Sequence, residues 1–185
     1  MFARTDRLLL RPGWMEDAPA LAAAIGEEAI VRNLATVPWP YGLRDAEAWL
    51  SRPSASALPH LLIFERGSGT PRLVGCTGFG RDEFSAIEFG YWIASDRWNR
   101  GYATEAGRAA LALARDSLRV PCIVSGHFVD NPASGRVLEK LGFVASGEAG
   151  VRRSLARGED VAFRPYRMSV CGTSCGCDEP ERMAA

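Results

Sequence analysis

The sequence predicts a mixed α/β (α+β) fold: a mostly antiparallel, twisted sheet of about six to seven strands with helices on both faces. Two observations predict it. Short apolar segments typical of strands alternate with helical segments along the chain. At 88–106, an apolar strand runs through a glycine turn directly into an alanine-rich helix. With 185 residues and no internal repeat, the chain is expected to form one domain over 1–170.

The first half of the chain is predicted to hold three strands and three short helices. The strands are expected at about 7–11, 61–64 and 73–77, and the helices at about 17–25, 27–34 and 44–50. Apolar residues spaced three or four apart indicate the helices, and a turn at 67–71 joins the second strand to the third. Segment 37–42 is too rich in proline for a regular element and is predicted to be a loop.

The second half is predicted to alternate strands with two longer helices. The strands are expected at about 86–94, 120–129, 143–148 and 161–170, and the helices at about 103–114 and 131–141. In the first of these helices, Ala106, Ala110 and Leu113 share one stripe, which should face the sheet. The second helix has Asn131 at its N-cap and Gly142 at the left-handed position after its end.

The turn before the alanine-rich helix is suited to an anionic ligand. The first backbone N–H groups of a helix have no partner within it, and the helix dipole places positive charge at the same end. Gly101 permits a close approach of the backbone, and Arg97 and Arg100 add cationic side chains beside it. The chain has neither a G-x-x-x-x-G-K-[ST] phosphate loop nor an early G-x-G-x-x-G dinucleotide motif. The turn is therefore predicted to hold a phosphate-bearing ligand of another kind.

Together these motifs resemble the GNAT N-acetyltransferase superfamily. Its members carry a [Q/R]-x-x-G-x-[G/A] turn that binds the pyrophosphate of acetyl-CoA, and an Asn-led helix ending in Lys-Leu-Gly-Phe, as at 98–103 and 131–143 here. Segments 5–12, 75–79 and 88–93 are similar to the RimJ/RimL-like branch, the ribosomal-protein N-terminal acetyltransferases. The similarity covers about 3–170. It implies a GNAT fold in which two central strands splay apart around acetyl-CoA, which is the cosubstrate.

The resemblance also implies which residues bind acetyl-CoA. They are Tyr91, Trp92 and Ile93 on the strand, Trp98, Asn99, Arg100, Gly101, Tyr102, Ala103 and Thr104 at the turn, and Asn131 on the far wall. The chain departs from the superfamily pattern at two positions. Trp98 stands where many members have Gln or Arg, and Leu138 where many have a tyrosine that protonates the leaving thiolate. The usual general acid is therefore missing.

Acetyl transfer from a thioester to an amine needs a base for the amine, a donor for the oxyanion and an acid for the thiolate. Glu88 is the candidate base, acting through a water, unless strand alternation makes it a surface charge. Ser134 is the candidate acid, unless its hydroxyl bonds back to its own helix. The oxyanion would meet a backbone N–H near Trp92 or Ile93. Since Cys122 has no obvious base beside it, direct transfer is expected.

The acceptor is the least defined part of the prediction. Trp39, Tyr41 and Trp49 stand where the branch places its acceptor wall, and aromatic side chains there suit a peptide N-terminus, a small amine or plain packing. A protein N-terminal α-amine is the favoured acceptor, with a small-molecule amine such as a polyamine, amino acid or aminoglycoside as the alternative. A non-catalytic acyl-CoA-binding module is the rival class.

Composition argues against several other classes. Lys and Arg number 22, as do Asp and Glu, so a nucleic-acid partner is not expected. No apolar run approaches the length of a membrane span, and a cytoplasmic monomer or homodimer is expected. His60 and His127 lack a nucleophile motif and are predicted to be structural. Segment 171–185, with three cysteines, is expected to be a flexible tail without a functional metal.

Overall fold

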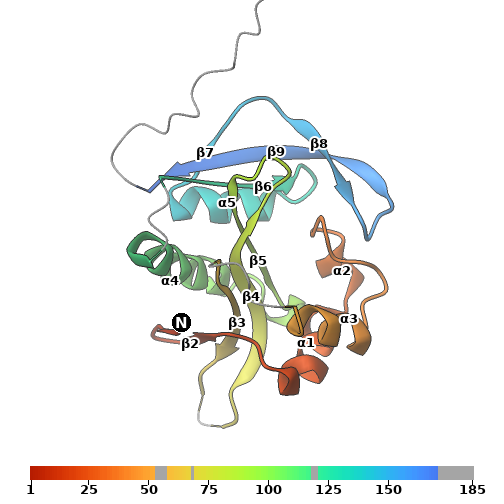
Figure 1. Ribbon diagram of the computed structural model, residues 1–185, viewed down its shortest axis with the longest axis vertical. Coiled ribbons are helices and arrows are strands. Elements are labelled where there is room, and N and C mark those ends of the chain that lie inside the picture. Colours follow the sequence, from red (N-terminus) through yellow and green to blue (C-terminus); the bar gives the residue numbers. More distant parts are fainter. Residues whose placement is uncertain (53–57, 68, 118–120, 171–185) are drawn as a thin grey trace, which may run out of the picture.

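The computed structural model describes residues 1–52, 58–67, 69–117 and 121–170 (Figure 1). The strands are β1 (Ala3–Arg4), β2 (Leu8–Arg11), β3 (His60–Glu65), β4 (Arg72–Arg81), β5 (Ile87–Ile93), β6 (Cys122–Phe128), β7 (Val144–Ala145), β8 (Gly150–Ser154) and β9 (Glu159–Ser169). The helices are α1 (Ala18–Ile25), α2 (Glu28–Val31), α3 (Leu43–Leu50), α4 (Tyr102–Ser117) and α5 (Pro132–Leu141). Short 3₁₀ helices, Met15–Asp17 and Ser95–Arg97, precede α1 and follow β5.

All described strands join one sheet. Its order is β1-β2-β3-β4-β5-β6-β9-β7, and β8 also pairs with β9. Every pairing is antiparallel except the contact between β5 and β6. The prediction of a mixed fold with a mostly antiparallel sheet is therefore confirmed. The expected tail at 171–185 lies outside the described residues.

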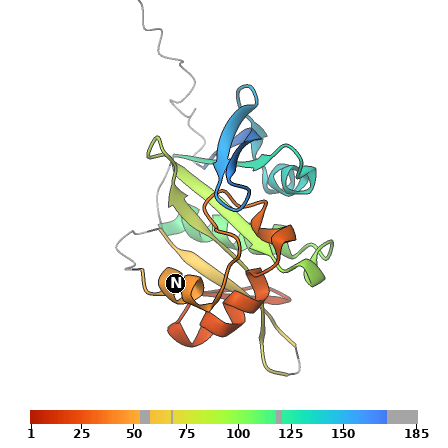
Figure 2. The ribbon, with the colours of Figure 1, turned by 90° about the vertical axis from the view of Figure 1, so that its right-hand side faces the viewer.

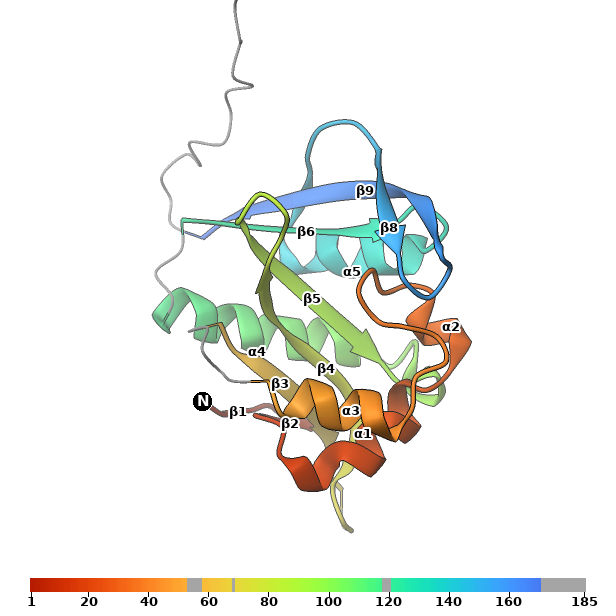
Figure 3. The same ribbon diagram turned by 45° about the vertical axis from the view of Figure 1, so that its right-hand side comes forward.

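Helices cover both faces of the sheet, as predicted. Successive side chains of a strand point to opposite faces, and on β3 Leu61 and Ile63 belong to the cluster that contains Ala106 of α4. Leu62 and Phe64 instead pack with residues of α1 and α3. Figure 3 shows α1 and α3 in front of the sheet, with α4 and α5 behind it. None of these helices is long and apolar enough to cross a membrane, within the part of the chain that is described.

The two long helices have the buried stripe and the caps that the sequence predicts. Ala106 and Ala110 of α4 are buried, and Leu113 is partly buried against the cluster that contains Ala106. At α5, the Asn131 side chain accepts a hydrogen bond from the Ser134 amide at 3.4 Å. Gly142 follows the helix with φ +94°, which is the left-handed position expected of it.

Several elements differ from the prediction, among them β4, which runs on to Arg81, and β1, which was not predicted. The helix expected at 27–34 is a four-residue piece, α2, after which the chain turns into an irregular segment. The strand expected at 143–148 has only two residues, β7, and β8 was not predicted at all. Of the five residues of β8 only Val151 is large and apolar, so no alternating pattern marks it as a strand. Pairing with β9 along its whole length forms it.

The central strands β5 and β6 diverge. They form one parallel contact, at Glu88 and Val124, whereas β4 and β5 pair over seven positions. One side-chain hydrogen bond also joins the two strands: the Ser125 hydroxyl of β6 donates to the Phe89 carbonyl of β5 at 2.9 Å. Beyond Phe89, β5 runs on toward α4 without pairing to β6, in the described residues. The last four residues of β5 therefore face an opening between the two halves of the sheet.

Candidate functional site

The first turn of α4 lies at the end of this opening. Gly101 has φ +79°, and its carbonyl accepts the first helical hydrogen bond from the Glu105 amide at 3.0 Å. The amides of Tyr102, Ala103 and Thr104 have no preceding helical carbonyl to bond to, and all three residues line a cavity. Their dipoles add to that of the sixteen-residue helix, so this end of the cavity is electropositive.

Of the two arginines predicted beside this turn, Arg97 lines the cavity and is paired with carboxylates of the protein. Arg97 Nε donates to Glu65 at 2.8 Å, and Arg97 Nη1 donates to Asp96 at 2.8 Å, so its charge is neutralised. Arg100 does not line the cavity, and its carbonyl accepts a hydrogen bond from Arg7. Arg97 therefore lies at the turn as predicted, with its charge paired to two carboxylates, whereas Arg100 is not among the cavity-lining residues.

The N-terminal segment braces the same turn. Glu105 accepts hydrogen bonds from the Thr5 hydroxyl at 2.5 Å and from Arg7 Nε at 2.7 Å. The Arg7 guanidinium also donates to the Arg100 carbonyl at 2.9 Å and lies 4.6 Å from the centroid of the Tyr102 ring. Burial opposes the charge of Glu105, but the hydrogen bonds from Thr5 and Arg7 outweigh it and lower the pKa of the carboxyl. Residues 5–7 therefore fix the shape of a turn almost a hundred positions away.

Strand alternation decides which backbone groups of β5 face the opening. The Ala94 amide donates to the Val74 carbonyl at 2.9 Å, which makes this a hydrogen-bonded pair of the β4–β5 ladder. Such pairs alternate with non-bonded ones. The main-chain groups of Trp92 therefore point to β4, and those of Tyr91 and Ile93 point to the opening. The Ile93 carbonyl there accepts a hydrogen bond from Trp98 Nε1 at 2.7 Å.

Two cavities meet beside β5. The larger, about 830 Å³, extends along the turn and α5, and the smaller, about 400 Å³, extends toward α3 and β8. Ten of the eleven residues predicted to bind acetyl-CoA line the larger cavity, Arg100 being the exception. The residues that line both cavities are Asn33, Leu34, Tyr91, Trp92 and Ser134. These five residues are therefore a wall that the two cavities share.

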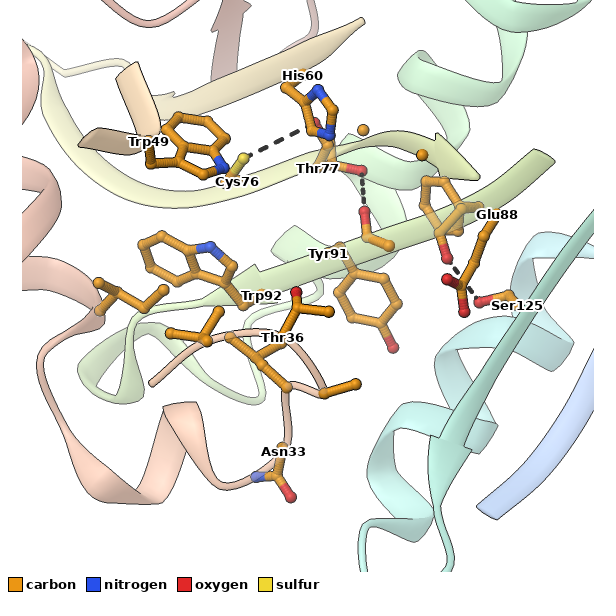
Figure 4. A pocket seen from close by; sticks show the side chains of 18 of the residues that line it. Asn33, Thr36, Trp49, His60, Cys76, Thr77, Glu88, Tyr91, Trp92 and Ser125 are labelled. Carbon is orange, nitrogen blue, oxygen red and sulfur yellow. Dashed lines mark hydrogen bonds between the residues drawn. The ribbon is translucent and has the colours of Figure 1, made fainter. Parts of the chain in front are cut away.

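Ser134 and Tyr91 touch at this junction. The Tyr91 hydroxyl lies 2.7 Å from Ser134 Oγ and 3.2 Å from the Ser134 carbonyl oxygen. Figure 4 shows the Tyr91 ring leaving β5 toward α5, with Trp92 beside it on the strand. Burial raises the pKa of Tyr91 to about 12, although the hydrogen bond with Ser134 opposes that shift. The predicted acid therefore has a phenol as its partner, which the sequence did not indicate.

Glu88 lines the smaller cavity and is paired with an arginine. Arg152, on β8, donates to both carboxylate oxygens, from Nη1 to Oε1 and from Nη2 to Oε2, the latter at 2.8 Å. The guanidinium also lies 5.0 Å from the centroid of the Phe163 ring. The hydrogen bond to Glu88 raises the pKa of Arg152. Glu88 is thus neither a free surface charge nor an isolated base.

Aromatic residues form the outer part of the smaller cavity. Tyr41, Trp49 and His60 line it, with the Trp49 and His60 rings edge to face at 5.9 Å (Figure 4). Burial is the largest cause that raises the pKa of Tyr41 to about 12 and lowers that of His60. Trp39 is 40% exposed and does not contribute to this wall. Of the three aromatic residues predicted for the acceptor wall, Tyr41 and Trp49 line this cavity and Trp39 does not.

His127 and Cys76 also line the smaller cavity. His127 Nδ1 lies 2.8 Å from the Phe128 carbonyl oxygen, and its ring packs against Tyr166 at 5.6 Å. Cys76 lines the smaller cavity, but burial raises the pKa of its thiol to about 12. At neutral pH this thiol carries almost no thiolate, which is the reactive form.

The turn between β8 and β9 forms hydrogen bonds with the segment that follows α2, which lies at the junction of the two cavities. The Leu155 amide donates to the Ala35 carbonyl at 3.0 Å. Arg157 donates to the Arg32 carbonyl at 2.8 Å and to both oxygens of Asp130 at 2.7 and 3.0 Å. Figure 2 shows this turn beside the loop that follows α2. Asn33 and Leu34 owe their place at the junction to contacts that span more than a hundred positions.

Comparisons with known proteins agree on one family. A family model described as an acetyltransferase (GNAT) domain matches residues 7–144. The protein YoaA of Bacillus subtilis (strain 168), described as an uncharacterized N-acetyltransferase, is 27% identical over 154 residues. That match covers 77% of this chain and 82% of YoaA.

Solved structures share the fold at lower sequence identity. RimL, a ribosomal L7/L12 α-N-protein acetyltransferase in complex with coenzyme A, has a TM-score of 0.76 at 18% identity, covering 91% of this chain and 98% of RimL. Spermidine N-acetyltransferase from Vibrio cholerae, in complex with CoA and spermine, has a TM-score of 0.73 at 18% identity, covering 89% and 96%. At such identity the similarity shows the fold alone.

Proposed function

The chain belongs to the GNAT family of acetyltransferases, and we propose that it moves an acetyl group from acetyl-CoA directly to a primary amine, as a member of the RimJ/RimL-like branch. The observation that carries this proposal is the meeting of two cavities at Tyr91, Trp92 and Ser134, with the positive end of α4 at the far end of one of them. One cavity has room for the thioester arm and the other for the amine. The thioester carbon would lie at their junction.

The larger cavity is the proposed cofactor site. The amides of Tyr102, Ala103 and Thr104 would bind the pyrophosphate, because the helix end supplies both donors and field. The main-chain groups of Tyr91 and the N–H of Ile93 point to the opening and would bond to the amides of the pantetheine arm or to the thioester oxygen. The Trp98 indole donates to the Ile93 carbonyl. The phosphates would therefore be bound by backbone amides and not by this side chain.

We assign three chemical tasks to residues around the junction. Glu88 acts as base through a water: a carboxylate has about four acceptor sites, and Arg152 occupies two of them. The N–H of Ile93 meets the oxygen of the thioester as it becomes an oxyanion. Ser134 donates its hydroxyl hydrogen to the sulfur as the carbon–sulfur bond breaks, since its Oγ lies where both cavities open.

The charges of the smaller cavity favour a protein N-terminal α-amine as acceptor. The two carboxylates in its described lining are both engaged: Asp45 accepts from the Gly42 amide at 2.8 Å, and Glu88 is paired with Arg152. A polyamine has several cations that need carboxylate partners, whereas a peptide end presents one amine followed by a neutral backbone. Aromatic walls at Tyr41 and Trp49 suit the first side chains of such a peptide.

The test is a screen of amine acceptors that follows release of free CoA thiol. Peptides with different N-terminal residues should be acetylated, with polyamines, amino acids and aminoglycosides slower. Turnover of a polyamine alone would overturn the choice of acceptor. The absence of turnover with every amine, together with tight acetyl-CoA binding in calorimetry, would indicate the non-catalytic binding module instead.

A substitution at Glu88 tests the assignment of the base. The Glu88→Gln variant should lose about 10²-fold or more in kcat, which is the usual contribution of a general base, and should bind acetyl-CoA as the wild type does. Glu148→Gln, an exposed carboxylate outside both cavities, is the matched control and should keep full turnover. An unchanged kcat in Glu88→Gln would remove this residue from the mechanism and leave the family assignment in place.

A further inference from the structure

The Tyr91 phenol is the closest described side-chain partner of Ser134. They come from different elements, β5 and α5, and meet where the two cavities join, with 2.7 Å between the two hydroxyl oxygens. No other side chain of the described residues makes a hydrogen bond to this phenol. The phenol of Tyr91 therefore contacts a single residue, Ser134, through its hydroxyl and its carbonyl.

The two hydroxyls hold two hydrogens, and their arrangement decides what Ser134 can do. If the phenol donates to the Ser134 carbonyl, the short contact requires Ser134 to donate to the phenol, and the serine hydrogen is then already used. If the phenol donates to Ser134 Oγ, the serine hydrogen is left for another acceptor. The 2.7 Å distance fits both arrangements, since either hydroxyl can be the donor there. Only the second arrangement leaves the serine hydrogen available to a leaving thiolate.

The phenol keeps its hydrogen across the neutral range. Burial raises the pKa of Tyr91 to about 12, so ionisation of the phenol is negligible below about pH 10. A phenol in this state is a constant donor and never a competing base. A donor to Ser134 Oγ has a further effect, because it stabilises the negative charge that develops on this oxygen when the serine gives up its hydrogen.

We propose that Tyr91 is the positioning residue for Ser134: it donates to Ser134 Oγ, turns the serine hydrogen toward the thioester sulfur, and supports the serine oxygen as that hydrogen leaves. The proposal rests on the proposed role of Ser134 as the acid. As the carbon–sulfur bond breaks, its electron pair passes to sulfur, which takes the serine hydrogen. The serine oxygen then regains a proton from water in the cavity, and Tyr91 keeps its own hydrogen throughout.

The first test is the Tyr91→Phe variant, which removes one oxygen from the side chain and keeps the ring. We expect kcat to fall about 10-fold, as for loss of one hydrogen bond in the transition state. KM for acetyl-CoA should stay within about twofold, because the main-chain groups that face the cofactor are unchanged. Tyr166→Phe is the matched control: its hydroxyl also bonds to a side chain of α5, Glu139, but lies outside both cavities.

A double-mutant cycle with Ser134→Ala separates positioning from a general structural role. If Tyr91 acts through Ser134, Tyr91→Phe should have almost no further effect on kcat once Ser134 is alanine. Equal losses in both backgrounds would overturn the proposal while leaving Ser134 as the acid. Full activity of Ser134→Ala would instead refute the acid role in the proposed function. A rise in KM equal to the fall in kcat for Tyr91→Phe would also overturn positioning in favour of simple packing.

Discussion

At the scale of single residues, Gly101 joins backbone conformation to ligand binding. Its φ of +79° is disfavoured for any residue with a Cβ atom. Space is not the restriction, because a Cβ atom there would meet Arg7 Nη2 at 3.6 Å, an ordinary contact. The cost of a side chain at this position is therefore conformational. The same strain would move the amides of α4 that are proposed to bind the pyrophosphate.

The Gly101→Ala variant should lose both stability and cofactor affinity. We expect a loss of about 1 kcal/mol in the free energy of unfolding from the left-handed conformation. We also expect weaker acetyl-CoA binding, by several-fold, measured by calorimetry. Lower stability with unchanged affinity would show that the turn amides do not hold the pyrophosphate.

Individual site residues were predictable where their role depends on neighbours in sequence. Asn131, Gly101 and Gly142 could be assigned because caps and turns are local. The partner of Glu88 could not, since Arg152 is 64 positions away on a strand without an apolar pattern. The same holds for the Tyr91 phenol, whose contact with Ser134 spans 43 positions.

At the scale of elements, α5 positions Ser134 at the site, and both ends of this helix are capped. Leu138 is fully buried in the main cluster, and Ser134, one turn before it, lies at the cavity edge. Gly135 lies against His127, where an added Cβ atom would meet Nε2 at 2.6 Å. The close approach of α5 to β6 therefore depends on this glycine. Periodicity predicted the helix and its buried face, but not which strand it would touch.

The end of α5 provides a test of helix capping that avoids the site. The Gly142→Ala variant should lose about 1 kcal/mol in the free energy of unfolding, because φ is +94° and no atom lies within 4 Å of the added Cβ. Gly150→Ala, also without a nearby atom but without a positive φ, should be close to neutral. Urea denaturation with an unchanged m-value measures both. Acetyl-CoA affinity should not change in Gly142→Ala, which also makes it the stability control for Gly101→Ala.

At the scale of the whole molecule, carboxylates tie segments that are far apart in the chain. Glu105 holds the N-terminal segment to α4, Glu65 holds β3 to Arg97 and Tyr102, and Asp130 holds the β8–β9 turn through Arg157. Asp17 pairs with Arg11 through two bonds of 2.7 Å, with both side chains largely buried. Hydrogen bonds and arginine charges lower the pKa of all four carboxyls.

Such shifts predict that the folded state is destabilised by acid. A carboxyl with a lowered pKa in the folded state binds its proton less readily than in the unfolded chain, where ordinary values are 3.8 for Asp and 4.5 for Glu. The stability it contributes is complete above those values and is lost as pH falls through the lower folded value. Urea midpoints should therefore be flat from about pH 7 to 5.5 and should fall steadily below about pH 5. Glu105→Gln should flatten that fall, because one linked carboxyl is gone, whereas Glu148→Gln should leave it unchanged. A midpoint that held constant down to pH 3 would show that these pairs do not stabilise the fold.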